Sequence, residues 1–395
     1  MRDGEQENSG PVGERLARAA RVASVLAQES AAIDRAAELT PAALAALHEA
    51  ELFRLMLPTF LGGAALAPAP LARICAMLAA GDASAAWCIG QAAGCAMSAA
   101  FMDRDAATNV FGPADAVLAW GAGAQGTALP VDGGYRVNGY WRFASGGRHA
   151  TWLGGHCRVV DETGHARRRA DGSVLLRTAL FPREMARIDD DWQVMGLRGT
   201  ASEGYEVSDL FVPAAFTLDR DDPEECRVEE TAFLFSLSAV YAACFSGVAL
   251  GVSRALLDAL IALAREKAPR GAGALRDNAD FQARLAILQA RHGAAEAYQQ
   301  RVLETAWTAA EEQGAVELEQ RLAIRLATTH AIQEATEIGG SAYRLAGADA
   351  IFEVGPFERR FRDLHAVSQQ VQGRHTHYET VGGHLLGAEA ASIFL

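Results

Sequence analysis

Apolar residues follow two different periodicities along this chain, and the order of the two limits the folds that it can adopt. From residue 12 to about residue 110, and again from about residue 230, they recur at the spacing of one face of an α-helix. Between these regions lie short β-branched or aromatic segments separated by Gly, Asp-Gly and Pro, which is typical of strands joined by turns. The sequence therefore predicts an α+β protein with an N-terminal helical domain (1–112), a central antiparallel β-domain (113–225) and a C-terminal four-helix bundle (226–395).

Local signals divide these regions further. Thr40-Pro41 provides a helix N-cap followed by proline, and the helix that it starts is expected to run until Pro58. The segment 69–101 is apolar on nearly every face, which predicts a buried helix or a pair of buried helices. Gly133-Gly134 between two apolar runs predicts a β-hairpin. The region after residue 230 is expected to form four long helices, the last of them spanning 358–387.

Composition excludes several classes of function. The 395 residues include 36 basic and 49 acidic side chains, for a net charge of −13, so nucleic acid or an anionic membrane would need a local basic patch. The only basic run, 167–169, is expected in a solvated hairpin loop. No apolar stretch approaches the roughly 20 residues of a membrane helix, the N-terminus carries no secretory signal, and the six cysteines include no CxxC pair. We therefore expect a soluble, cytoplasmic, oligomeric protein that binds neither nucleic acid nor membranes.

Three segments carry more information than their periodicity. They read AWGAGAQGTALPVDGGYRVNGYWRFASGGRHATW (119–152), DDWQVMGLRGTASEGYEVSDLFVP (190–213) and FRDLHAVSQQVQGRHTHYETVGGHLLG (361–387). In this order and spacing they resemble the acyl-CoA dehydrogenase superfamily. Within it they are most like the group D flavin-dependent monooxygenases, the oxygenase halves of two-component systems. The resemblance covers roughly residues 40–390 and implies the same order of helices, β-domain and helical bundle.

The resemblance also implies a chemistry. Reduced FMN or FAD would arrive from a separate flavin reductase and react with O2 to give a C4a-hydroperoxide, whose distal oxygen passes to a small-molecule substrate. Such an intermediate needs a dry, closed pocket and fixed hydrogen bonds around flavin N5. The family further implies a homotetramer that assembles through the C-terminal bundle.

Carried over residue by residue, the resemblance assigns flavin contacts in the first segment to Trp141, Phe143 and Ser145, with the Ser145 hydroxyl at the N5 edge. Without the resemblance, this stretch reads as an alternating strand whose serine begins a turn. In the second segment it assigns Trp192, Arg198, Thr200 and Ser202, where a loop rich in N–H and hydroxyl donors suits a flavin edge or phosphate. A β-bulge loop with a surface arginine is the alternative there.

Three further flavin contacts are implied in the C-terminal region. Arg276 and Gln282 resemble residues that reach the flavin of a neighbouring subunit, although an arginine at a helix start is otherwise a surface charge. Gly340 lies in a Gly-Gly-Ser turn that resembles the one beside flavin in these tetramers, and a helix C-cap is compatible with the same sequence.

Departures from the family pattern reduce the number of reactions that this chain is expected to catalyse. A thioester dehydrogenase needs a glutamate base, but one family position holds Val371 and the other falls in FSLSAVYAACF, which has no carboxylate. The substrate loop reads GAGAQ (121–125) in place of GAGSD. Glu379 remains a candidate for a relocated base. These losses argue against desaturation of a thioester.

The phenol-hydroxylating branch has two histidines that are also missing. Gln370 stands where a histidine closes the RDxHA segment, and the helix after GDASAAW offers only Gln91. We therefore hypothesise a substrate that needs no deprotonation at oxygen, such as an amine or a sulfur centre, with Ser145, His365 and Gln370 as the candidate catalytic residues. The expected pocket, formed by residues near 91–98, 121–125 and 365–377, carries no charge that identifies the substrate.

Two other functions remain open from the sequence. One is a flavin dehydrogenase or oxidase of the same fold with a relocated base, and the other is a catalytically reduced member that serves as a binding partner. His375 and His377 lack a carboxylate or cysteine at metal-ligand spacing, so we expect no metal site.

Overall fold

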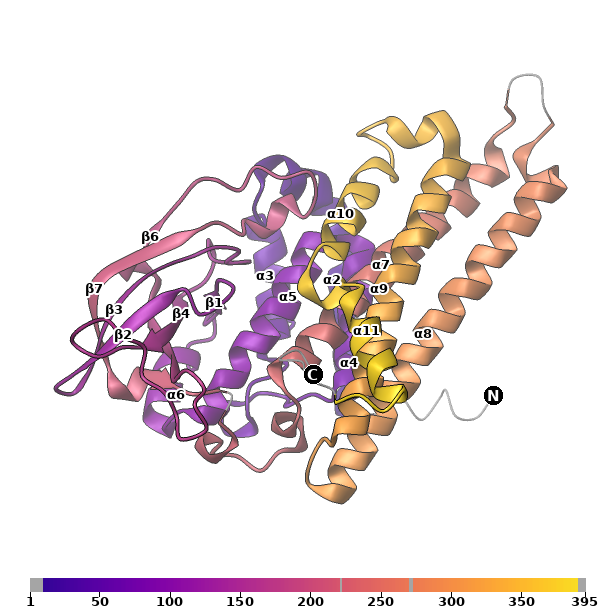
Figure 1. Ribbon diagram of the computed structural model, residues 1–395. Helices are drawn as coiled ribbons and strands as arrows, with labels where there is room; N and C mark the ends of the chain where they lie inside the picture. The colour runs from indigo at the N-terminus through magenta and orange to yellow at the C-terminus, as the bar shows by residue number, and fades with distance from the viewer. Residues whose placement is uncertain (1–9, 221, 270–272, 390–395) are drawn as a thin grey trace.

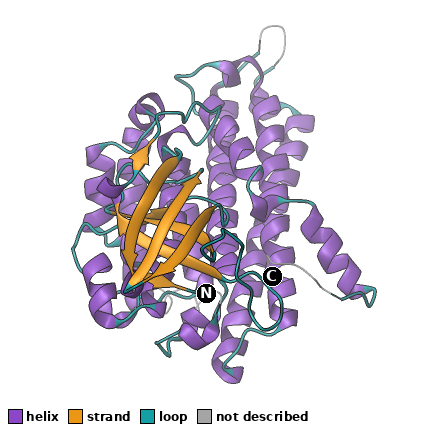
Figure 2. Ribbon diagram, turned by 60° about the vertical axis from the view of Figure 1, so that its left-hand side comes forward, coloured by secondary structure: helices purple, strands orange, loops and turns teal. Residues whose placement is uncertain are grey.

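The computed structural model describes residues 10–220, 222–269 and 273–389. Its elements form three layers, with a β-sheet on one side, the N-terminal helices in the middle and the long C-terminal helices on the other side (Figure 1). Figure 2 shows the sheet as a layer in front of the helices. This order of helices, sheet and helices confirms the predicted fold class.

Side-chain caps set the ends of the helices in the middle layer. Thr40 Oγ1 accepts a hydrogen bond from the N–H of Ala43 (3.2 Å), as the Thr-Pro signal predicts. Asp82 accepts from the N–H of Ala85 (2.9 Å) and thereby separates two buried helices, so the apolar segment is the predicted pair. The N-terminal helices within the described residues are α2 (Pro11–Ala36), α3 (Pro41–Glu49), α4 (Pro68–Gly81), α5 (Ala83–Ala96) and α6 (Arg104–Phe111).

The helix that starts after Thr40 is shorter than predicted. It ends at Glu49, and the chain then passes through a left-handed conformation at Glu51 (φ 58°). Short 3₁₀ turns follow as far as Leu61. The apolar residues before Pro58 are buried in this irregular stretch, so helical spacing alone overestimated the length of the helix.

The sheet is built around a tight hairpin. The predicted hairpin forms between the second and third strands, where Val131 pairs with Gly134 and Gly133 supplies the positive φ (75°) that the turn requires. The strands are β1 (Leu118–Trp120), β2 (Gly126–Val131), β3 (Gly134–Trp141), β4 (Trp152–Val159), β5 (Leu176–Pro182), β6 (Arg187–Ile188), β7 (Tyr205–Pro213) and β8 (Thr217–Leu218). Their order is β6-β7-β3-β2-β4-β5-β8, with β1 paired to β4.

The prediction of a wholly antiparallel sheet is wrong at β4. This strand runs parallel to both β1 and β2. The hairpin β2–β3 is followed by a connection, residues 142–151, that returns the chain to the other side of β2 instead of making a second hairpin with β3. That connection contains the Phe143–Gly147 segment, which lies at the ends of the strands beside α5, where Ser145 accepts a hydrogen bond from Trp87.

The C-terminal layer contains three long helices and a fourth segment that is broken. The long helices are α7 (Leu237–Glu266), α8 (Ala279–Gln313) and α9 (Leu318–Ala346). The predicted fourth helix is instead α10 (Glu358–Ser368), a 3₁₀ turn and α11 (Thr376–Leu385). Gln370 accepts a hydrogen bond from the N–H of Gln372 (2.6 Å), which begins a new turn and explains why one helix does not continue.

Helix α7 lies at the centre of the protein. By length and composition it could cross a membrane, contrary to the expectation from sequence, but 67% of its most apolar window is buried inside the protein, as in the core helix of a bundle. It crosses α4 at close range because Gly247 and Gly251 face the carbonyl groups of Ala72 and Ala76. A Cβ atom at either glycine would collide with that backbone.

This crossing makes a prediction about stability. Gly251→Ala would place a methyl group against the Ala76 carbonyl, so we expect the free energy of unfolding to fall by about 1–3 kcal/mol, as in other overpacked cores. Gly293→Ala is the matched control, because Gly293 is exposed on α8 with nothing near its Cβ position. There we expect a gain of about 0.5–1 kcal/mol from helix propensity. Urea unfolding followed by circular dichroism measures both, and equal effects would contradict the close crossing.

Candidate active site

The Trp192–Ser202 loop is held in a conformation that its own sequence does not favour. Leu197 and Ala201 both have positive φ, at 54° and 43°. Asp363 on α10 accepts a hydrogen bond from the backbone N–H of Leu197 (2.7 Å), and the Trp192 indole N–H donates to the Leu197 carbonyl (3.2 Å). The loop is therefore shaped by contacts with the bundle and by its own tryptophan.

Arg362 and Asp363 are neighbours in the sequence, but they take different partners. Arg362 pairs with Asp34 on α2 (3.0 Å) and with Glu358 one turn before it, and it donates to the Met195 carbonyl (2.5 Å). Asp363 is fully covered and is satisfied by the loop. Burial, with a contribution from the nearby Asp82 charge, raises the pKa of the Asp363 carboxyl to about 7.

Three hydroxyl groups form a buried row beside this loop. Ser145 Oγ lies 2.6 Å from Ser202 Oγ, and Ser202 Oγ lies 2.7 Å from Thr200 Oγ1. At one end the Trp87 indole N–H donates to Ser145 (3.0 Å), and at the other end Thr200 donates to the Leu197 carbonyl (2.8 Å). Because the donor at one end and the acceptor at the other are fixed, every hydroxyl hydrogen in the row points the same way. Ser145 donates to Ser202, and Ser202 donates to Thr200.

An exposed aromatic side chain faces the same region. Phe143 has a positive φ (67°). Its side chain is large and apolar, yet 54% of its surface is exposed. Its ring lies 6.1 Å from Trp192 at an interplanar angle of 89°. Trp192 and Arg198 line a cavity of about 520 Å³ together with Ala37. An open aromatic surface beside a cavity of this size fits a planar ligand such as a flavin.

A stack of aromatic rings continues from the hydroxyl row into the core. Trp87 stacks on Phe245 with ring centroids 3.9 Å apart, and Phe245 stacks on Tyr241 at 5.4 Å. The Tyr241 hydroxyl then accepts hydrogen bonds from Gln91 Nε2 and from the Trp120 indole N–H, both at 3.0 Å. The segment FSLSAVYAACF contains no carboxylate, and Tyr241 is its tyrosine, which no sequence motif singles out. The signal that could have found it is the i, i+4 pair of aromatic residues in an otherwise small-residue helix.

The polar groups at the end of this stack stay protonated at neutral pH. Burial raises the pKa of Tyr241 well above its usual value, and burial raises the pKa of the Cys95 thiol, 3.8 Å from the Tyr241 hydroxyl, to about 12. Gln91 is an amide and does not titrate. The wall formed by Gln91, Cys95, Trp120 and Tyr241 therefore offers hydrogen bonds without a general base.

The remaining predicted site residues lie elsewhere, and their roles stay predictions. Trp141 is fully buried in the sheet, where its indole N–H donates to the His156 carbonyl (2.9 Å). His365 packs against Phe361 with ring centroids 4.3 Å apart. Gln370 caps the 3₁₀ turn described above, so its side-chain oxygen is already engaged.

Three further candidates lie in the bundle. Gly340 is buried within α9 and does not form a turn that ends the helix. Arg276 and Gln282 lie together near the connection between α7 and α8, where Gln282 Nε2 donates to the Arg276 carbonyl (2.7 Å), at the end of the bundle away from the sheet (Figure 1). The candidate relocated base, Glu379, is exposed on α11 and 3.9 Å from His375.

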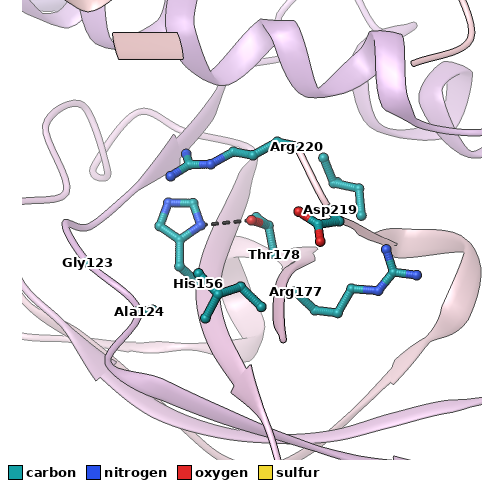
Figure 3. Close-up of a pocket in the computed structure, with 9 residues that line it drawn as sticks. Gly123, Ala124, His156, Arg177, Thr178, Asp219 and Arg220 are labelled. Atoms are coloured by element: carbon teal, nitrogen blue, oxygen red, sulfur yellow. Dashed lines mark hydrogen bonds between the residues drawn. The ribbon is translucent and has the colours of Figure 1, made fainter. Parts of the chain in front are cut away.

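A second cavity lies in the β-domain, and charged side chains from distant segments line it. It occupies about 90 Å³ beside Gly123 and Ala124 of the expected substrate loop. Figure 3 shows His156, whose Nδ1 lies 2.8 Å from Thr178 Oγ1, and the guanidinium group of Arg220 above the histidine ring. The residues near 121–125 carry no charge of their own, but the fold brings Arg220 beside them from a segment about 100 residues later.

Comparisons with known proteins agree with this arrangement. Residues 243–374 match the family described as acyl-CoA dehydrogenase, C-terminal domain. An indole-3-acetate monooxygenase from Pseudomonas putida is 28% identical over 386 residues, covering 96% of this chain and 95% of that protein. A flavin-dependent monooxygenase, oxygenase subunit HsaA, from Rhodococcus jostii is 35% identical over 171 residues, 42% of each chain. The structure of XiaF from Streptomyces sp., in complex with FADH2 and glycerol, superposes with a TM-score of 0.88 at 25% identity over 100% of both chains.

The fold and the site together are similar to those of the acyl-CoA dehydrogenase superfamily, whose C-terminal domain matches residues 243–374 of this chain. Within that superfamily the chain is similar to the oxygenase components of two-component flavin-dependent monooxygenases, which confirms the resemblance that its three motif segments indicate.

The buried Asp363 carboxyl makes a prediction about pH. Between its ordinary pKa of 3.8 and its raised value of about 7, the folded protein keeps a proton that the unfolded chain has lost. Stability therefore falls as pH rises through this window, by at most about 1.4 kcal/mol per pH unit for one group. Asp363→Asn keeps the oxygen that accepts from Leu197 and removes the titration. We expect a flatter pH dependence of unfolding for this variant, measured by urea titrations from about pH 4 to about pH 8.

Asp277→Asn is the control for this prediction, because Asp277 is 73% exposed and should leave the pH dependence unchanged. If the Asp363→Asn variant and the wild-type protein lost stability in parallel across this pH window, Asp363 would not be the group that keeps the proton, and the prediction would be wrong.

Proposed function

We propose that this chain is the oxygenase component of a two-component flavin-dependent monooxygenase. It takes reduced flavin from a separate reductase, and O2 as the oxidant, to oxygenate a small organic substrate. The observation that carries the proposal is the oriented row of buried hydroxyls beside the exposed Phe143 ring and the Trp192 cavity. The similarity over nearly the full length to an indole-3-acetate monooxygenase supports it.

The residues of the loop fit a bound reduced flavin. Phe143 and Trp192 would contact its ring system, and Arg198 would supply a positive charge for its phosphate or its polar edge. When bound, reduced flavin provides the two electrons with which O2 is divided, one oxygen atom going to substrate and the other to water. Whether the flavin is FMN or FAD depends on contacts at its far end.

Ser145 has a defined hydrogen-bonding role in this site. Its oxygen accepts from Trp87, and its own hydrogen is directed to Ser202 because Ser202 donates in turn to Thr200. Ser145 therefore retains one lone pair, which can accept a hydrogen bond from an N–H group of a ligand. The row is buried, so water does not compete for that lone pair.

The wall formed by Gln91, Cys95, Trp120 and Tyr241 limits which substrates can react. Gln91, Cys95 and Tyr241 hold no negative charge at neutral pH, so they cannot remove a proton from a phenol. This supports oxygen transfer to a group that reacts without deprotonation at oxygen, either an amine nitrogen or a sulfur centre. The electron-rich ring of an indole is a second candidate, favoured by the named substrate of the relative.

The flavin dehydrogenase or oxidase remains the alternative function, and it is less well supported. Its candidate base, Glu379, is 70% exposed on α11. We further propose that the enzyme is a cytoplasmic homotetramer, in which Arg276 and Gln282 reach the flavin of a neighbouring subunit. Analytical ultracentrifugation tests the tetramer.

The proposed reaction is tested by isotope labelling. The protein is loaded anaerobically with chemically reduced FMN or FAD and mixed with ¹⁸O2 and a panel of indoles, aromatic amines and sulfides. We expect one labelled oxygen atom in the product for each flavin oxidised. Reoxidation of bound flavin that yields only hydrogen peroxide with every substrate would contradict a monooxygenase and favour an oxidase.

The hydroxyl row makes a separate prediction. Ser145→Ala removes the acceptor for a ligand N–H, a hydrogen bond worth about 0.5–1.5 kcal/mol or up to roughly tenfold in rate. We expect a clear rise in the share of O2 that is released as hydrogen peroxide, measured by coupled peroxide assay. Ser253→Ala, which removes a buried serine hydroxyl from α7, is the matched control and should leave the share unchanged. Equal behaviour of the two variants would remove Ser145 from the site.

A further inference from the structure

The row of three buried hydroxyl groups has a fixed direction, and that direction decides what Ser145 can offer to a ligand. The Trp87 indole N–H donates to Ser145 at one end (3.0 Å), and Thr200 donates to the Leu197 carbonyl at the other (2.8 Å). Between these ends Ser145 donates to Ser202, and Ser202 donates to Thr200. All three hydroxyl hydrogens are therefore used inside the protein, and one lone pair of Ser145 remains.

The opposite direction is less favourable for the protein by itself. If Thr200 donated to Ser202 and Ser202 donated to Ser145, the hydrogen of Ser145 would point away from the row. Within the described residues it would meet no acceptor, because the polar contacts of the Ser145 side chain are the Trp87 indole N–H and Ser202. Ser145 is only 6% exposed, and a buried donor without a partner is unfavourable.

The surrounding structure holds both ends of the row. Trp87 is buried in α5 and stacks on Phe245 of α7, with ring centroids 3.9 Å apart and an interplanar angle of 12°. Its N–H is therefore fixed in place, and an indole N–H can only donate. The Leu197 carbonyl is held by the positive φ of that residue and by the bond from its N–H to Asp363 (2.7 Å). The direction of the row is therefore set before any ligand binds.

A lone pair at Ser145 distinguishes the two redox states of a flavin. Atom N5 of reduced flavin carries a hydrogen and donates, whereas N5 of oxidised flavin carries only a lone pair and accepts. Ser145 can accept from the reduced form with the row as it stands. With the oxidised form, either two lone pairs would face each other, or all three hydroxyls would reverse and the bond from Thr200 to the Leu197 carbonyl would be lost.

We propose that the direction of this row makes the site selective for reduced over oxidised flavin, and that Thr200 is the positioning residue that sets the direction. The inference rests on the proposed function, because it takes Ser145 to meet the N5 edge of the flavin. Such selectivity suits an oxygenase whose flavin is reduced on another protein, since the oxidised form must leave before the next reduced flavin binds. It concerns affinity, so it is measurable without substrate or turnover.

The test compares the affinities of the full chain for the two redox states. Isothermal titration calorimetry measures the binding of FMN and FAD, in air for the oxidised forms and anaerobically for the forms reduced with dithionite. We expect wild-type protein to bind the reduced form of at least one flavin about tenfold more tightly, as for one hydrogen bond. A tenfold preference also raises the two-electron potential of the bound flavin by about 30 mV, which spectroelectrochemistry measures independently.

Variants at Thr200 separate the direction of the row from other contacts with flavin. Thr200→Val removes the hydroxyl that fixes the direction, so Ser202 can donate to Ser145, and the preference should fall by about fivefold to tenfold. Thr200→Ser keeps a hydroxyl and should keep the preference. Thr328→Val is the matched control, because it removes a buried threonine hydroxyl that donates to Ile324 within α9 (2.7 Å). Circular dichroism and thermal unfolding establish that each variant folds.

A flavin analogue gives the same test without a mutation. Position 5 of an oxidised 5-deazaflavin carries a C–H group, so it presents no lone pair to Ser145. We expect wild-type protein to bind oxidised 5-deaza-FMN or 5-deaza-FAD about fivefold or more tightly than the matching oxidised flavin. Thr200→Val should bind the analogue no more tightly than the flavin. Equal binding of the two by wild-type protein would overturn the proposal, even if Thr200→Val did not fold.

The outcomes separate this proposal from the proposed function. If a folded Thr200→Val keeps the wild-type preference while ¹⁸O enters a product, the monooxygenase activity stands and the role of the row fails. If the preference depends on the Thr200 hydroxyl but no ¹⁸O enters any product, the selectivity stands and the monooxygenase activity fails. Wild-type protein that binds neither redox state of FMN or FAD would overturn both.

Discussion

The hydrogen bond from the Leu197 N–H to the Asp363 carboxyl is the contact on which the geometry of the site depends. It joins the loop between two strands of the sheet to a helix of the C-terminal layer, 166 residues later. Together with the hydrogen bonds that the Leu197 carbonyl accepts, it holds a non-glycine residue in the left-handed region at this point. The positive φ of Leu197 in turn aims its carbonyl at Thr200 and at the Trp192 indole.

The Leu197 carbonyl sets the direction of the hydrogen bonds in the hydroxyl row. A fixed acceptor at one end and the indole N–H of Trp87 at the other leave only one arrangement of the three hydroxyl hydrogens between them. The row ends at Ser145, in the connection that returns the chain to the other side of β2. The parallel pairing of β4 is therefore a feature of the site, since it carries the Phe143–Gly147 segment to the boundary between sheet and helices.

Much of the architecture could be predicted from periodicity and caps. The Thr40 cap, the paired buried helices and the hairpin at Gly133 are local features, because neighbouring residues make the hydrogen bonds that define them. The errors lie where a distant contact overrides the local signal. The helix after Thr40 gives way to buried 3₁₀ turns. The last predicted helix is interrupted where the carbonyls of Gln372 and Gly373 accept hydrogen bonds from Thr329 and Gln333 of α9.

The same distinction holds for the site. Two sequence motifs contain Ser145, Ser202, Thr200 and the Phe143–Trp192 pair, so these residues could be predicted from the sequence alone. Tyr241 belongs to no motif, because its importance comes from donors on α5 and β1 that converge on one hydroxyl. The charge of the β-domain cavity was missed for the same reason, since Arg220 reaches the 121–125 loop only through the folding of the sheet.

By itself, the sequence determined the order of helices, sheet and bundle and the segments that carry the flavin motifs, since apolar periodicity and short motifs are properties of consecutive residues. Only the tertiary structure decided which strand runs parallel, where the last helix breaks and which partner Asp363 takes. Each of these depends on groups far apart in the chain whose buried hydrogen bonds and charges must be satisfied together, and no local pattern records that requirement.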